Sequence, residues 1–182
     1  MDPKAALRAE MRTRRRRLAV EAPDAAERAA ANLPANGWPD IEVYGLYHPV
    51  GSELDPTPIR LKTGRRALPV VVSPDAPLVF RLHGPNDPLT PDALGIPAPT
   101  AAAPQVWPDI VFAPLLAFDR RGGRLGQGGG HYDRTIADLR ARKAVLVIGL
   151  AYAGQEVDDI PMAPHDQRLD AILTETAYVP VR

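Results

Sequence analysis

One stretch of the chain combines residue types that could bind an anion and a metal ion. It reads Arg-Leu-Gly-Gln-Gly-Gly-Gly-His-Tyr-Asp from Arg124 to Asp133 and holds four of the chain's 14 glycines. Glycine lets a ligand approach bare backbone, and a helix beginning after such a loop directs free N–H groups and a positive dipole end at the ligand. Arg124 and Arg134 add positive charge, and Asp133 adds a carboxylate able to hold Mg2+ against a phosphate oxygen. This stretch alone predicts a nucleotide or phosphate site.

The glycine stretch does not match the two best-known phosphate-binding motifs. No Gly-Lys-Ser/Thr follows it, which excludes a P-loop, and His131 stands where the third glycine of G-x-G-x-x-G would be. A tight turn needed only for packing would also explain the glycines. The flanking residues Arg124 and Tyr132-Asp133 favour the ligand site, and His131 is better suited to a loop or ligand contact than to general-base catalysis.

A second candidate site lies between His48 and Asp55, directly after a β-prone run at 43–47. In open α/β sheets, ligands bind at the loops beyond the carboxyl ends of strands. Glu53 and Asp55 could therefore accept hydrogen bonds from an N–H-rich ligand. Asp55 could equally cap a short helix at 56–62, and the residues alone leave both interpretations open.

The histidines supply no recognisable catalytic or metal-binding pattern. None of the four pairs with another at metal-ligand spacing, and no Ser-His-Asp arrangement can be argued from their order. His165-Asp166 could cap a turn or present Asp166 to a metal ion, and the residues alone favour the cap.

The elements that must position these residues alternate between strands and helices. This alternation predicts a layered α/β fold with a largely parallel sheet, in a single domain over residues 1–182. We expect a long surface connection over 87–104, with at most one helical turn near 91–94, and a loop over 155–168. Helices are expected at 4–19, 23–33 and 135–143, and strands at 43–47, 67–72, 77–83 (antiparallel to its neighbour), 110–118, 144–151, 171–176 and 178–181.

Composition narrows the functional classes. Hydrophobic residues make up 45% and charged residues 24%, as is usual for a soluble globular protein. Neither a membrane-spanning run nor a signal peptide is recognisable, and the absence of cysteine excludes disulfides and thiolate sites. We therefore expect a cytoplasmic protein without membrane partners. The zero net charge provides no bulk field that would favour nucleic acid.

The N-terminal helix is nevertheless basic, with seven basic against two acidic residues in positions 1–20. Lys4, Arg8 and Arg12 recur at i, i+4 and i+8 and so lie along one face. Spacing alone favours a solvated surface for this face over a polyphosphate ligand.

The run from Phe112 to Arg134 resembles the signature of the 5-formyltetrahydrofolate cyclo-ligase family, also called 5,10-methenyltetrahydrofolate synthetase. Three further segments resemble family segments in the right order: Lys4–Arg8, Gly51–Asp55 and His165–Glu175. The chain departs from the family where His131 replaces a common Tyr and Pro56 a common Thr.

The resemblance implies a three-layer α/β/α fold and ATP- and Mg2+-dependent cyclisation of 5-formyltetrahydrofolate to 5,10-methenyltetrahydrofolate, with release of ADP and phosphate. It implies small-molecule substrates and a monomer or homodimer, and it favours Lys4 and Arg8 as polyphosphate ligands. Arg124 and Asp133 would be catalytic, and Asp133 and Asp166 would hold Mg2+. ATP would be contacted by Lys4, Arg8, Arg124, Leu125, Gly126, Gln127, Gly128, Gly129, Gly130, His131 and Tyr132, and the folate by Val50, Glu53, Asp55, Gln127, His131 and Tyr132. Of the two acids, the resemblance favours Asp55 over Glu53 as the folate contact.

Two other classes compete with this interpretation. A sugar-phosphate isomerase or related phosphate-binding enzyme on a similar α/β fold would need a catalytic acid or base at the loop and would consume no ATP. A nucleic-acid-binding protein would use the arginine-rich helix, but the zero net charge and an aromatic content of 5% argue against it.

Overall fold

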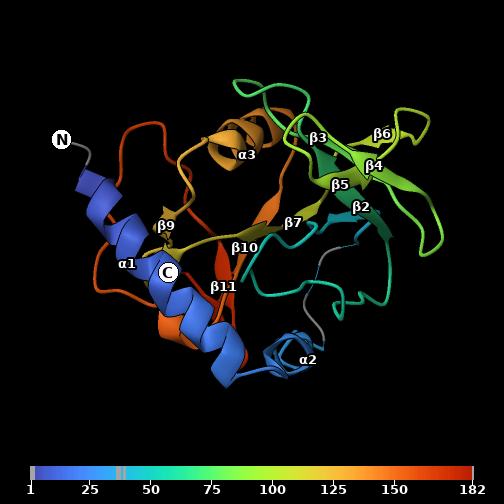
Figure 1. Ribbon diagram of the computed structural model, residues 1–182. Helices are drawn as coiled ribbons and strands as arrows, with labels where there is room; N and C mark the ends of the chain where they lie inside the picture. Colours follow the sequence, from blue (N-terminus) through green and yellow to red (C-terminus); the bar gives the residue numbers. More distant parts are fainter. Residues whose placement is uncertain (1–2, 36–37, 39, 182) are drawn as a thin grey trace.

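A computed structural model describes residues 3–35, 38 and 40–181, and it shows a mainly parallel eight-stranded sheet between helices (Figure 1). The helices are α1 (Pro3–Glu21), α2 (Ala25–Ala31), α3 (His131–Arg142) and the short 3-10 helix η1 (Ala153–Gln155). The prediction of a layered α/β fold is therefore confirmed. Among the described residues, no helix combines the length and apolar character needed to cross a bilayer.

Five central strands of the sheet run parallel, and its edges are antiparallel. The pairs β11·β10, β10·β7, β7·β1 and β1·β2 are parallel, whereas β12, β3 and β6 join antiparallel. Chain order reverses between β1 and β7, because β2 lies on one side of β1 and β7, β10 and β11 follow on the other. The spatial order is β12 (Tyr178–Pro180), β11 (Ala171–Leu173), β10 (Leu146–Leu150), β7 (Ile110–Pro114), β1 (Val43–Gly45), β2 (Arg65–Val70), β3 (Val79–Leu82) and β6 (Gln105–Val106).

Both faces of the sheet are covered, which explains why its central strands are apolar without alternation. On β7, Ile110 and Phe112 pack in a cluster that contains Ala25 and Ala29 of α2. Val111 lies in another cluster with Leu139 of α3. Successive side chains of one strand therefore meet helices on opposite faces, and the sheet is fixed between α1 and α2 on one side and α3 on the other.

The predicted surface connection over 87–104 is wrong, because this segment forms a β-hairpin. Strands β4 (Leu89–Pro91) and β5 (Pro97–Pro99) pair antiparallel. Asp92 holds the turn: its Oδ1 accepts the N–H groups of residues 94 and 96, and its Oδ2 accepts the N–H of Val71, directly after β2. In a two-stranded ribbon prolines can occupy positions that donate no ladder bond, so they do not prevent pairing.

Three further predictions near the candidate sites differ from the structure. The strand expected at 110–118 divides: β7 ends at Pro114, and β8 (Ala117–Phe118) pairs antiparallel with β9 (Arg124–Leu125). Helix α3 begins at His131, four residues before its expected start. No helix forms over 56–62, and the Asp55 carboxylate instead accepts the N–H of Thr57 in a local turn.

Candidate functional site

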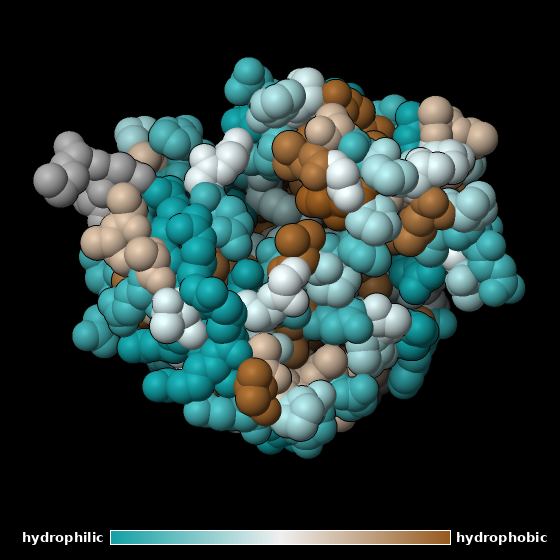
Figure 2. Space-filling model, in the orientation of Figure 1, coloured by the Kyte–Doolittle hydropathy of each residue, from teal (hydrophilic) through white to brown (hydrophobic). Residues whose placement is uncertain are grey.

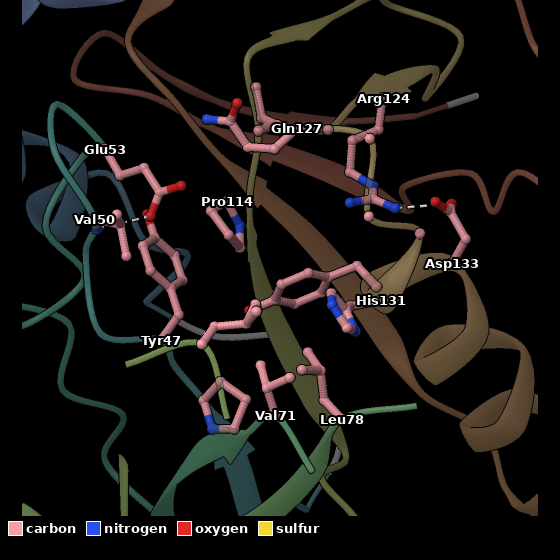
Figure 3. A pocket seen from close by; sticks show the side chains of 18 of the residues that line it. Tyr47, Val50, Glu53, Val71, Leu78, Pro114, Arg124, Gln127, His131 and Asp133 are labelled. Atoms are coloured by element: carbon pink, nitrogen blue, oxygen red, sulfur yellow. Dashed lines mark hydrogen bonds and ion pairs between the residues drawn. The ribbon is translucent and has the colours of Figure 1, made fainter. Parts of the chain in front are cut away.

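A cavity of about 380 Å³ opens where the strand order reverses, beyond the carboxyl ends of β1 and β7. Tyr47 and Glu53 enter it from the chain after β1, and Pro114 from the end of β7 (Figure 3). The glycine loop and the first turn of α3 enter from the opposite side. A reversal of strand order creates a crevice of this kind in doubly wound folds.

The glycine loop is shaped by two residues in the left-handed backbone region. Gly128 has φ +108° and Gly130 has φ +68°, conformations that L side chains rarely adopt. Gly130 is also the N-cap of α3 and makes no side-chain capping bond. Since Gly130, His131 and Tyr132 line the cavity, the amino end of α3 meets any ligand there with backbone N–H groups and the positive end of its dipole.

Arg124 brings a buried cation to this end of the cavity. Its side chain is 3% exposed, its Nη2 donates to Asp133 Oδ1 at 2.8 Å, and its guanidinium carbon lies 5.6 Å from the centre of the Tyr132 ring. The Arg124 Nε is buried and has no hydrogen-bond partner among the described residues. A buried N–H without an acceptor is costly, so this atom indicates that a ligand oxygen completes the site.

Two basic residues of α1 line the same cavity. Lys4 Nζ lies 2.5 Å from Asp166 Oδ2, and Arg8 Nε donates to the carbonyl of Gly126 at 3.1 Å. The predicted solvated surface is therefore wrong for Lys4 and Arg8. Arg12 is exposed, as predicted, and its Nε donates to Gln127 Oε1 at 3.0 Å. The basic face of α1 thus points at the glycine loop.

Asp133 and Asp166 also lie together at this end. Asp133 accepts the N–H of Gln167 at 3.0 Å, which ties α3 to the loop that carries Asp166. Burial raises the pKa of Asp166, but hydrogen bonds from Lys4 and from the N–H of Ala163 outweigh it and hold the pKa below its usual range. Within the described part of the chain no group of three or more metal-binding side chains occurs. Two carboxylates suit Mg2+ nonetheless, since this ion commonly takes one or two carboxylates together with substrate phosphates.

The opposite end of the cavity carries a different acid. Glu53 lines the cavity, its side chain is 10% exposed, and its Oε2 accepts the N–H of Val50 at 3.0 Å. Burial raises the pKa of Glu53, against the opposing effects of the Val50 N–H and Arg15. Val50 also lines the cavity, but Asp55 does not belong to its lining. The structure thus brings Glu53, and not Asp55, to the site.

Sequence reasoning missed the apolar part of the cavity. It is formed by side chains from β2 and the residue after it, from the segment before β3 and from the β4–β5 hairpin, namely Pro69, Val71, Leu78, Leu94 and Ile96. In Figure 2 hydrophobic residues gather beside the hollow near this hairpin, and hydrophilic residues cover α1. Such a surface suits a flat organic ring system. No local pattern marks these residues, because they come from separate segments.

The fold and the site together define a class: a doubly wound α/β protein with a cationic glycine loop and an apolar cavity at the switch point. The model of the 5-formyltetrahydrofolate cyclo-ligase family matches residues 1–175, and the chain belongs to that family. The resemblance of the sequence motifs is therefore confirmed. Membership also disfavours the sugar-phosphate isomerase alternative.

Individual relatives agree with this membership. A 5-formyltetrahydrofolate cyclo-ligase of Haemophilus influenzae is 40% identical over 100 residues, which are 53% of this chain and 53% of that protein, so the match spans about half of the relative. That of Escherichia coli (strain K12) is 34% identical over 131 residues, 67% of this chain and 71% of that protein. The solved structure of Aquifex aeolicus 5,10-methenyltetrahydrofolate synthetase has a TM-score of 0.75 and 29% identity, over 98% of this chain and 93% of that one.

Proposed function

We propose that this protein catalyses the ATP- and Mg2+-dependent cyclisation of 5-formyltetrahydrofolate to 5,10-methenyltetrahydrofolate. One observation supports the proposal most directly: a single cavity has a cationic end around Arg124 and an apolar end that carries a buried acid, Glu53. A nucleoside triphosphate suits the cationic end, and a folate ring system suits the apolar end. Both substrates can then lie against each other within one site.

The chemistry explains why both must share the cavity. The formyl oxygen of the substrate is a poor leaving group, so the γ-phosphoryl group of ATP is transferred to it and ADP is released. N10 of the folate then attacks the activated formyl carbon. The carbon–oxygen bond to phosphate breaks, N10 loses its proton, and the methenyl bridge remains. Phosphoryl transfer depends mainly on positioning and charge stabilisation.

The chain's own residues fit these requirements. The unpartnered Arg124 Nε and the N–H groups of the glycine loop would bind phosphate oxygens, together with Lys4 and Arg8. Asp133 and Asp166 would hold Mg2+, which supplies charge neutralisation at the transferred phosphate. Glu53 would accept hydrogen bonds from the donor-rich pterin edge, and the proposal assigns this contact to Glu53 in place of Asp55.

The test is a spectrophotometric assay. Absorbance in the methenyl-folate band should rise when 5-formyltetrahydrofolate, ATP and Mg2+ are mixed with the protein. It should stay flat when ATP is omitted or Mg2+ is chelated. No ATP-dependent rise would refute the assignment, and a sugar-phosphate isomerase would consume no ATP. A cytoplasmic location and a monomeric or homodimeric state form part of the proposal and can be tested by fractionation and light scattering.

A variant sharpens this test. Asp133→Asn removes a carboxylate charge at the cationic end and should lower kcat by about 100-fold with an unchanged circular dichroism spectrum. Asp138→Asn is the matched control, because Asp138 lies on the same helix and pairs with Arg142 at the surface. Wild-type turnover in Asp133→Asn would remove Asp133 from the site.

A further inference from the structure

Helix α1 presents a row of side chains to the cavity loops, one turn after another. Lys4 contacts Asp166 in the loop before β11, and Arg8 contacts Gly126 in the glycine loop. Farther along the helix, Arg15 contacts the segments behind the opposite end of the cavity, namely Ser52 after β1 and Leu115 after β7. One rigid element thus touches both the proposed nucleotide end and the proposed folate end.

Arg15 is buried, although it lies within a run of four arginines. Its Nε donates to Ser52 Oγ at 3.2 Å and its Nη1 donates to the carbonyl of Leu115 at 3.1 Å. The same Nη1 lies 3.7 Å from Glu53 Oε1. Arg15 therefore connects the loop after β1 with the end of β7, the two segments that flank the reversal of strand order.

The position of Arg15 matters because Glu53 is a buried carboxylate. Removing a carboxylate from water disfavours its charged form unless a cation or hydrogen-bond donors replace the water. The Val50 N–H supplies one donor, and Arg15 supplies the cation. Tyr47 and Tyr132 also lie near Glu53, but burial raises the pKa of both phenols, so they remain neutral and add no competing negative charge. The Tyr47 hydroxyl donates to the carbonyl of Leu54 and not to Glu53.

We propose that Arg15 is a positioning residue that holds Glu53 ionised and directed into the cavity, where Glu53 receives the N–H groups of the folate. Arg15 is not part of the cavity lining, so it acts through Glu53 and not on the substrate. This role rests on the proposed function, since it presupposes a folate at the Glu53 end.

The experiment measures the Kd of 5-formyltetrahydrofolate by calorimetry without ATP, from pH 5 to 8.5. Arg15→Gln removes the charge but keeps an N–H donor for the Leu115 carbonyl. Without the cation the pKa of Glu53 rises, so the pH below which binding weakens should move upward by about one unit. At the acid end of this range the Kd should be higher than in the wild type by up to about tenfold, the limit for a shift of one unit, and the difference should vanish at pH values above both pKa values. Arg15→Lys, which restores the charge, should return the profile toward the wild type.

The matched control is Arg14→Gln, because Arg14 is the neighbouring residue and pairs with Glu10 on the surface of the helix. Its pH profile should equal that of the wild type. If Arg15→Gln binds with the wild-type profile, the inference is overturned; a purely structural role would lower the melting temperature without moving the profile. If the wild type itself binds no folate, the proposed function fails and this inference fails with it.

A comparison within the Glu53→Gln background tests the inference without the Arg15→Gln single variant. In a Glu53→Gln background no charge needs the cation, so adding Arg15→Gln should change the folate Kd by less than twofold. A further tenfold loss in the double variant would show that Arg15 acts independently of Glu53 and would overturn the inference.

Discussion

Asp119→Asn should destabilise the turn that delivers the glycine loop to the cavity. The Asp119 side chain is 2% exposed, and its carboxylate accepts three backbone N–H groups. Its Oδ1 accepts those of Arg121 at 2.8 Å and Gly123 at 2.9 Å, and its Oδ2 accepts that of Ile160 at 2.9 Å. These bonds close the β8–β9 turn and fix it to the segment after η1 that contains Ile160.

The magnitude follows from these three bonds. The Asn oxygen can accept the N–H groups of Arg121 and Gly123. Its amide nitrogen then faces the N–H of Ile160, and because both are donors no hydrogen bond can form. A hydrogen bond to a charged group contributes about 1.5–3 kcal/mol and a neutral one about 0.5–1.5 kcal/mol, and an unsatisfied buried donor costs about 1–3 kcal/mol. Relief from burying a charge offsets part of this loss, which leaves a net destabilisation of about 2–4 kcal/mol. For a chain of 182 residues the melting temperature should fall by roughly 5–15 °C.

A circular dichroism melt measures this change. Asp159→Asn is the control, because Asp159 is exposed and pairs with Arg121 at the same turn; surface pairs contribute about 0–1 kcal/mol. A melting temperature of Asp119→Asn within 1 °C of that of the wild type would refute the reasoning.

Two further predictions concern the loop backbone and acid stability. Gly128→Ala forces a side chain onto φ +108°, with its Cβ 3.6 Å from the Arg8 guanidinium; the strain of about 1–3 kcal/mol should weaken ATP binding about tenfold, and unchanged calorimetric affinity would contradict this. Burial raises the pKa of Asp109, but Lys143 and two backbone N–H groups outweigh it and hold the pKa low. The resulting stability is present above the unfolded pKa of about 3.9 and disappears as pH falls through the folded pKa. Urea unfolding of Asp109→Asn should therefore lose less stability between pH 5 and 3 than the wild type, and equal losses would contradict this.

The central strands of the sheet could be predicted from the sequence, because strands buried on both faces appear as continuous apolar runs. Strand β10 lies within the apolar run at 144–151, and β7 within that at 110–118. Covered strands need apolar residues at every position, so a continuous run indicates both the strand and its two helical layers. The glycine loop could also be predicted, because backbone with positive φ favours glycine and a cluster of glycines is recognisable in the sequence.

The apolar half of the cavity could not be predicted, because its residues become neighbours only through pairing between distant segments. Leu94 and Ile96 reach the cavity because the β4–β5 hairpin packs beside β2, and that packing depends on Asp92 accepting the N–H of Val71. A proline-rich segment without alternation gives no indication of such a contact. The expected preference for Asp55 over Glu53 as the folate contact is reversed by the structure, because only Glu53 lines the cavity.

Arg15 is a buried residue whose position the spacing i, i+4, i+8 does not predict. An α-helix turns by about 100° per residue, so the row Lys4, Arg8 and Arg12 drifts by about 40° at each step and ends at the exposed edge. The spacing 4, 8, 11, 15 alternates four and three residues and stays within an arc of about 60°. Met11, on this row, is fully buried. A single apolar residue in register with three cations therefore marks the face of α1 that meets the protein, and it distinguishes Arg15 from the arginines on either side.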